Sequence, residues 1–198
     1  METKLEILNR VYRTLAVDDE AMHYIIKAHE QVTFKKGEII LPKNKTMDCY
    51  YILSSGIARS FIYKHNRADI TTDFYIAGDI IIDMVSLFQQ TPSEVCIEAI
   101  SDLVCFKIKF DEFQKLQLQY PSYSDWGRNW MTQAFFKLRQ RAIKMATQPA
   151  SSRYADIRKN LPEVYRDVPL KYIASYLGMT NTSLSRLRSQ KINSTSTV

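Results

Sequence analysis

Short polar and basic side chains crowd the stretch between residues 167 and 191, which reads DVPLKYIASYLGMTNTSLSRLRSQK. Hydroxyl, amide and guanidinium groups hydrogen-bond to base edges and to phosphates, which is the chemistry of a surface that reads DNA. On a helix that begins near Thr180, one face carries Asn181, Thr182, Ser185, Arg186 and Ser189, and the opposite face carries Leu184 and Leu187. The stretch therefore predicts a polar helix face that fits a major groove.

Two helices and a tight turn would have to position this face. Ile173, Ala174 and Leu177 recur at the spacing of a first helix. Gly178 supplies a turn, because glycine adopts positive φ at little steric cost, and Thr180 can cap the second helix. The same pattern is also typical of an ordinary helical hairpin, so periodicity alone leaves both interpretations open.

Charge favours the DNA interpretation. Residues 1–136 carry 15 Lys and Arg against 18 Asp and Glu, a balance of −3, whereas residues 137–191 carry 12 against 3, a balance of +9. A basic face of this kind is often only solvated, but here it coincides with the helix-turn-helix pattern. We therefore place DNA binding ahead of the simple hairpin.

The composition predicts a globular cytoplasmic protein. The chain has 198 residues, of which 45% are hydrophobic, enough for one large domain or two small ones. No run approaches the roughly 18 apolar residues that span a bilayer, and the charged start METKLEILNR is unlike a signal peptide.

Neither the cysteines nor the histidines have ligand spacing. Cys49, Cys96 and Cys105 sit singly in apolar runs, which favours buried thiols over a disulfide or a metal site. The three histidines share no metal-ligand pattern, so we expect no metal and no cofactor.

The middle of the chain has the pattern of an antiparallel β-structure. Two short helices are expected in the first thirty residues, followed by β-rich runs near 31–35, 38–41, 49–53, 57–64, 70–76, 95–100 and 103–109. Gly37, Gly56 and Gly78 fall in the turns between these runs. Seven short strands predict a barrel or jelly roll, with a short helical turn around Met84 to Phe88.

A long helix is predicted from about residue 122 to residue 146. Met131, Ala134, Leu138, Arg141 and Met145 are spaced 3, 4, 3 and 4, a heptad seam interrupted by one arginine, and Trp126, Trp130 and Phe135 lie on an adjoining face. Two apolar faces suggest two partners, the β-structure and a second copy of the chain. Burial of both faces within one monomer is the alternative.

The order of these parts resembles the Crp/Fnr family of bacterial transcription regulators. Its most specific stretches are KKGEIIL, YYILSSGIARSFI, AGDII and VPLKYIASYLGMTNTSLSRLR, the last being closer to a branch found in Bacteroidetes-like bacteria than to enteric members. The resemblance implies an α+β fold, with a β-roll sensor domain at 1–120, a dimerisation helix and hinge at 121–147, and a helix-turn-helix domain at 148–198. It implies a winged-helix-like domain with a short or truncated wing.

For partners, the resemblance implies double-stranded DNA, a second copy of the chain and RNA polymerase. The two helix-turn-helix domains of a homodimer would enter successive major grooves roughly 34 Å apart. For dimerisation we expect contacts from Trp130, Met131, Ala134, Leu138 and Met145.

The effector pocket departs from the family pattern. Nucleotide-binding members use a Gly-Glu-Leu segment, and an Arg-Ser or Arg-Thr pair about ten residues later that binds the cyclic phosphate. The matching positions here read Ile82-Asp83-Met84 and Ser93-Glu94. We therefore expect a degenerate pocket in which Asp83 and Glu94 repel a phosphate and cyclic AMP or cyclic GMP binds weakly or not at all.

The second helix also departs from the enteric pattern, since Thr182 replaces a glutamate that accepts from cytosine. Arg186 keeps the family's arginine and is the expected main base reader, because arginine binds guanine O6 and N7 bidentately. Secondary readers would be Asn181, Thr182 and Ser185, and phosphate contacts would come from Lys171, Thr180, Arg188 and Lys191.

Three other functions compete with sequence-specific regulation. An enzyme would need a nucleophile with a base, paired carboxylates or a phosphate loop, and the chain shows none at usable spacing. A ligand-sensing β-roll that acts through a protein partner is the stronger rival, although the basic C-terminal end argues against it. A non-specific architectural DNA binder is the third.

Overall fold

The computed structural model describes residues 3–64 and 68–195, with side chains described up to Ser189. The first half contains α1 (Lys4–Val11), α2 (Asp19–Lys27), β1 (Glu30–Phe34), β2 (Ile39–Leu41), β3 (Cys49–Ser55), β4 (Ala58–Tyr63), β5 (Asp69–Tyr75) and β6 (Ile80–Ile81). The second half contains α3 (Met84–Gln89), β7 (Cys96–Ala99), β8 (Leu103–Lys109), α4 (Phe110–Gln119), α5 (Pro121–Thr147), α6 (Ala150–Asn160), α7 (Pro162–Asp167), α8 (Leu170–Tyr176) and α9 (Asn181–Thr195).

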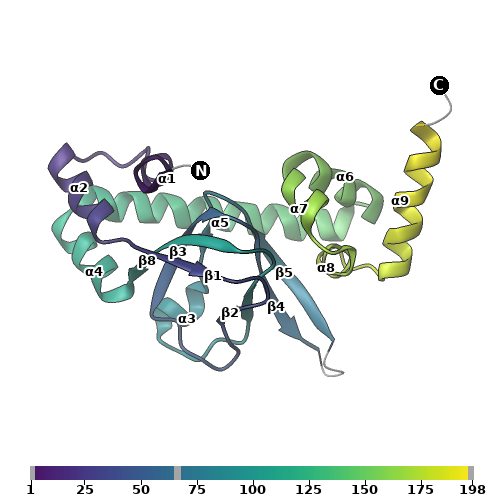
Figure 1. Cartoon of the computed structure of the whole chain (residues 1–198), viewed down its shortest axis with the longest axis horizontal. Coiled ribbons are helices and arrows are strands. Elements are labelled where there is room, and N and C mark those ends of the chain that lie inside the picture. Colours follow the sequence, from purple (N-terminus) through teal and green to yellow (C-terminus); the bar gives the residue numbers. More distant parts are fainter. Residues whose placement is uncertain (1–2, 65–67, 196–198) are drawn as a thin grey trace.

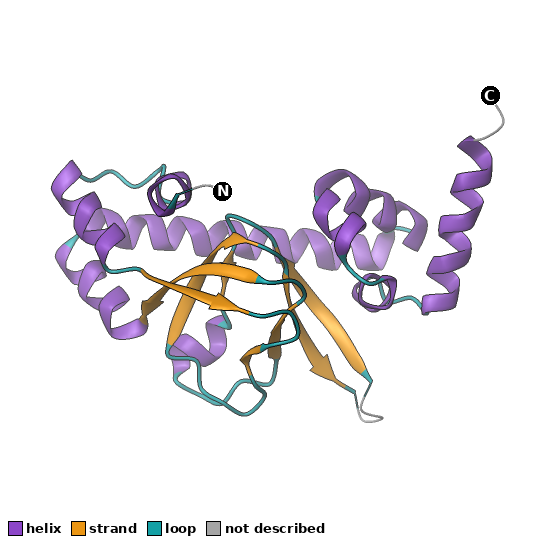
Figure 2. Ribbon diagram, in the orientation of Figure 1, coloured by secondary structure: helices purple, strands orange, loops and turns teal. Residues whose placement is uncertain are grey.

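The strands form two four-stranded sheets, which confirms the predicted antiparallel β-roll. Their orders are β1-β8-β3-β6 and β2-β7-β4-β5, and every paired neighbour is antiparallel. Each of the seven predicted runs contains a strand; the two-residue β6 is an addition. The strands lie together beneath α5, and helices gather toward both ends of that helix (Figure 1, Figure 2).

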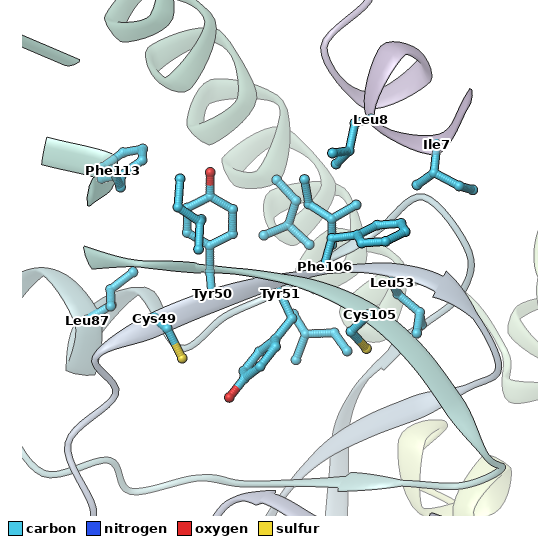
Figure 3. Packing of buried hydrophobic residues seen from close by; sticks show 14 of the residues in the cluster. Ile7, Leu8, Cys49, Tyr50, Tyr51, Leu53, Leu87, Cys105, Phe106 and Phe113 are labelled. Atoms are coloured by element: carbon cyan, nitrogen blue, oxygen red, sulfur yellow. The ribbon is translucent and has the colours of Figure 1, made fainter. Parts of the chain in front are cut away.

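The side chains of β3 alternate between the two sides of its sheet, and both sides are buried. Along β3, Tyr50 points to the side of α5, whereas Cys49 and Tyr51 point to the other side (Figure 3). Ile7 and Leu8 of α1 pack on the first of these sides. Because both faces of the sheet are covered, β3 is a nearly continuous buried run rather than an alternation of buried and exposed residues.

The turn between β3 and β4 requires a glycine. Gly56 has φ +97°, and a Cβ atom there would lie 2.3 Å from the carbonyl oxygen of Asp102. All three glycines expected in turns, Gly37, Gly56 and Gly78, have positive φ. The three cysteines are buried and free, as predicted.

A buried network of hydroxyl groups ties the N-terminal helices to the roll. The Tyr12 hydroxyl lies 3.1 Å from that of Tyr50 and 3.2 Å from that of Tyr123 on α5. Nδ1 of His29 donates to the carbonyl oxygen of Ile25 at 2.7 Å, so Nε2 of the neutral ring accepts from the Tyr12 hydroxyl at 3.0 Å. Burial raises the pKa of Tyr12 and of Tyr50 well above the usual value, so the network stays neutral.

His29 makes the stability of this region depend on pH. Burial lowers the pKa of His29 from 6.5 to about 4. Between these values the unfolded chain binds a proton that the folded chain does not, so stability is present above pH 6.5 and is lost as the pH falls toward 4. The loss is on the order of 3 kcal/mol.

Denaturant unfolding between pH 4 and pH 7 measures this loss. His29→Gln, which keeps a donor and an acceptor but does not titrate there, is expected to flatten the profile. The exposed His23 provides a matched control, and His23→Gln should leave the slope as in the wild type. Equal slopes in wild type and His29→Gln would contradict the assignment.

Two helices, α4 and α7, were not predicted from the sequence. α4 buries Phe113 and Leu116 against the roll, and α7 buries Val164 in the C-terminal core. The long helix α5 begins at Pro121, a favoured first helical position, and ends at Thr147. The three helices α6, α7 and α8 pack together, while α9 stands at the far end of the molecule (Figure 1).

Candidate functional site

The segment that holds the polar helix face consists of α8, a short turn and α9. Gly178 has φ +67° in the turn, and the N–H of Met179 donates to the carbonyl oxygen of Ala174 at 2.9 Å. Thr180 caps α9: its hydroxyl oxygen accepts from the N–H of Ser183 at 3.1 Å. The turn glycine and the cap therefore stand where the sequence predicts them.

The inner faces of the two helices form one core. Ile173, Ala174, Leu177 and Leu184 are at most 2% exposed, and Leu187 is half-buried. Tyr154, Ile157, Val164 and Val168 join this core from α6, α7 and the segment that follows, and Ile57, Phe74 and Ile100 join it from the roll. Packing of this kind, rather than helix propensity, holds a helix of only seven residues such as α8 in place.

The predicted base readers lie exposed on α9. Asn181, Thr182, Ser185 and Arg186 are all exposed, on the first two turns of the helix. Residues four apart lie on the same side of a helix, so Asn181 lies above Ser185 and Thr182 lies above Arg186 along one face of α9. These side chains are free to meet a ligand.

Lys171, Thr180, Arg188 and Lys191 are the residues predicted to contact phosphates. Lys171 and Thr180 are exposed; the Lys171 ammonium lies 4.7 Å from the ring centroid of Tyr172. Arg188 is exposed, with its guanidinium 5.9 Å from the ring centroid of Tyr165. The side chain of Lys191 lies outside the described residues. Both α8 and α9 therefore carry an exposed cation among the described residues.

Two of the three predicted effector-pocket residues, Asp83 and Ser93, bind each other. The buried Ser93 hydroxyl donates to Oδ2 of Asp83 at 2.6 Å and accepts from the N–H of Val95 at 3.1 Å. Glu94 is exposed. The three positions thus supply two carboxylates and one hydroxyl that already has its partners, and none supplies a cation for a phosphate.

The long helix α5 presents two faces, but they do not follow the predicted seam. Trp130 and Met131 line a small apolar cavity of about 20 Å³ against the roll, together with Tyr50 and Phe113. Ala134 is half-buried. Arg141 turns toward β5, and its guanidinium donates to the carbonyl oxygen of Thr72.

An exposed apolar stripe on α5 contains Leu138 and Met145 of the predicted seam together with Phe135 and Ala142. Phe135, Leu138 and Met145 are 60%, 62% and 40% exposed, and Ala142 is exposed beside them. Their spacing of 3, 4 and 3 is a heptad seam with no arginine in it. Leu138 and Met145 therefore belong to this stripe, while Trp130 and Met131 belong to the roll.

Three arginines that hold α8 were not predicted from the sequence. Arg59 of β4 contacts Tyr172, Arg141 of α5 contacts Tyr176, and Arg153 of α6 donates to the carbonyl oxygen of Leu177. The interruption of the heptad seam by Arg141 was a usable signal, because a charge in an apolar stripe needs a partner. No local pattern marks Arg59 or Arg153.

Within residues 3–64 and 68–195 there is no group of three or more His, Cys, Asp or Glu side chains that could hold a metal ion. None of the described helices is both long enough and apolar enough to cross a bilayer.

Comparisons with known proteins identify the architecture. Residues 31–120 match the family model of the cyclic nucleotide-binding domain. FixK2 from Bradyrhizobium japonicum is similar in structure, with a TM-score of 0.69 and 19% identity over 84% of this chain and 85% of that one. No curated protein matched the sequence.

Two further solved structures share the fold. The c-di-GMP-responsive global regulator CLP from Xanthomonas campestris has a TM-score of 0.68 and 10% identity over 89% of this chain and 93% of that one. A protein from Eubacterium rectale assigned to the Crp/Fnr family of transcriptional regulators has a TM-score of 0.68 and 19% identity over 89% of this chain and 85% of that one.

Proposed function

We propose that the chain is a sequence-specific DNA-binding transcription regulator, because it has the fold of the Crp/Fnr regulators and its residues 31–120 match the family model of the cyclic nucleotide-binding domain. Residues 1–120 would form the sensor domain, residues 121–147 the dimerisation helix and hinge, and residues 148–198 the DNA-binding domain. Residue 186 would be the main base reader.

The observation that carries the proposal is the polar face of α9. Four side chains that can hydrogen-bond to bases lie exposed on its first two turns, and the cations Lys171 on α8 and Arg188 on α9 are exposed as well. An α-helix fits the major groove of B-DNA, where each base pair presents a distinct pattern of donors and acceptors. The excess of positive charge in residues 137–191 supplies the non-specific attraction to phosphates.

The exposed stripe of α5 supports a homodimer. Phe135, Leu138, Ala142 and Met145 would pack against the same residues of a second copy, since apolar residues at heptad spacing form a helix–helix seam. A two-fold dimer would place two α9 helices on successive turns of DNA. Contact with RNA polymerase remains a prediction from the family resemblance.

Cyclic nucleotides are not expected to be the effector. Ser93 and Asp83 satisfy each other, so a cyclic phosphate would meet carboxylates instead of an arginine. Isothermal titration of purified protein with cyclic AMP and with cyclic GMP is expected to give no heat at micromolar concentrations. Micromolar binding of either nucleotide would contradict the degenerate pocket.

Selection from random double-stranded DNA tests the proposed function. The full chain should enrich a two-fold symmetric site at physiological salt, and the site should compete better than unrelated DNA in a mobility-shift assay. Binding without any enriched sequence would indicate an architectural DNA binder. Absence of DNA binding would favour the rival function, a sensor that acts on a protein partner.

A further inference from the structure

Three separate parts of the molecule hold α8 in place, each through one arginine. Arg59 comes from the β-roll, Arg141 from the long helix α5, and Arg153 from α6, which follows the hinge. α8 is only seven residues long, and its inner face already packs in the C-terminal core. The contacts of Arg59 and Arg141 therefore add to the apolar packing of Ile57, Phe74 and Ile100, which already joins that core to the roll.

Arg59 forms the contact with the roll. It is 1% exposed, and its guanidinium lies 3.5 Å from the ring centroid of Tyr172 on α8. Its Nε donates to Oε1 of Glu98 at 2.6 Å, its Nη1 donates to the Thr71 hydroxyl at 2.9 Å, and its Nη2 is paired with Asp69. Its hydrogen-bonding partners all lie in the sheet, so Tyr172 stacks on a guanidinium whose position is already fixed.

Arg141 and Arg153 hold the C-terminal end of α8. Nη2 of Arg153 donates to the carbonyl oxygen of Leu177 at 2.7 Å. The guanidinium of Arg141 lies 3.9 Å from the ring centroid of Tyr176, and it also donates to the carbonyl oxygen of Thr72 in β5. Cations at this end are favourable, because the last carbonyl groups of a helix carry partial negative charge.

Two direct contacts also join α8 to β5; together with the three arginines they form what we call the seat of α8. The backbone N–H of Thr71 donates to the hydroxyl of Ser175 at 2.7 Å, and the Phe74 ring lies 5.1 Å from that of Tyr176. β5 is the last strand of its sheet, so Ser175 of α8 takes up a backbone donor that no strand satisfies there. The seat leaves the polar face of α9 exposed.

We infer that Arg59, Tyr172 and Arg141 are positioning residues for DNA recognition. They fix the angle of α9 to the dimerisation helix α5 without any bound effector. In a dimer this angle sets the distance and direction between the two reading helices, and therefore the spacing of the two half-sites on DNA. The inference rests on the proposed function and adds to it: these residues select spacing, whereas α9 selects bases.

Tyr172→Ala tests the inference by selection from random DNA. The wild type should enrich one dominant half-site spacing. The variant should enrich the same half-site bases at three or more spacings, because the reading helices are no longer held at one angle. On the site that the wild type selects, its affinity should fall about tenfold, as expected when the competent orientation drops to about a tenth of the population.

Two readouts separate positioning from a general loss of structure. Tyr172→Phe keeps the ring over Arg59 and should restore the single spacing. The slope of affinity against salt should fall by no more than about 1 in Tyr172→Ala, because among the predicted phosphate contacts the ring lies beside Lys171, whose ammonium is 4.7 Å from the ring centroid. Tyr24→Ala, at a 42% exposed tyrosine of α2, is the matched control and should behave as the wild type.

Arg141→Gln provides a second test, because it releases α8 from α5 at its other end. It should broaden the spacing in the same way. An unchanged single spacing in both folded variants would overturn the positioning role while leaving the proposed function intact. A wild type that enriches no half-site would instead overturn the proposed function, and the positioning role with it.

Discussion

Replacing Arg186 with alanine is expected to remove most of the sequence preference of the protein while leaving substantial binding to DNA. Arg186 is exposed on the second turn of α9, beyond the capped first turn. A bidentate contact from arginine to guanine is worth about 1 to 3 kcal/mol of discrimination, which is roughly 5- to 150-fold in each half-site. Competition between the selected site and a scrambled site measures this ratio.

Lys171→Ala is expected to act differently. An ammonium that contacts phosphate contributes equally on every sequence, so its loss should weaken binding to selected and scrambled DNA alike and reduce the salt slope by about 1. Arg128→Ala, at an exposed arginine of α5 that pairs with Asp125, is the matched control for loss of a positive charge. Identical effects of Arg186→Ala and Lys171→Ala would contradict the division between base reading and phosphate binding.

Leu138→Asp is expected to convert the dimer into monomers. Leu138 is 62% exposed in the single chain, so an aspartate there should not disturb the monomer fold. In the proposed seam two such carboxylates would face each other in an apolar interface, and an uncompensated buried charge costs roughly 3 to 5 kcal/mol. The dimer dissociation constant should therefore rise more than a hundredfold, as measured by sedimentation at a series of concentrations.

The same substitution at another exposed leucine provides the control. Leu118 on α4 is 87% exposed and lies outside the stripe, so Leu118→Asp should leave the dimer intact. DNA binding should fall with dimerisation in Leu138→Asp, since one half-site alone makes about half of the contacts. A dimer that survives Leu138→Asp would place the interface elsewhere on the chain.

The parts predicted best from sequence are those that local patterns control. The strands follow from short β-rich runs between turn residues, and the turn before α9 follows from Gly178 and Thr180, whose roles are local. The inner faces of α8 and α9 follow from helical spacing, and Ile173 and Leu184 are buried as predicted. In the candidate site, helical spacing also predicts that the expected base-reading residues of α9 are exposed.

The parts missed are those that distant contacts decide. Arg59 meets Tyr172 across more than a hundred residues, so nothing near either residue marks the pair. The predicted heptad seam included Arg141, whose guanidinium instead donates to β5. Sequence spacing cannot tell which side of α5 meets β5. α4 was missed because it buries only two apolar side chains, Phe113 and Leu116, too few for a clear helical period.

The seat of α8 has a consequence for the sheet that receives it. β5 is an edge strand, and Ser175 and Arg141 occupy backbone groups of Thr71 and Thr72 that would otherwise be free to pair with another chain. Open edges of this kind are templates for aggregation. α8 thus shields part of this edge, and a chain that lacks residues 148–198 would leave the backbone N–H of Thr71 open to pair with a strand of another chain.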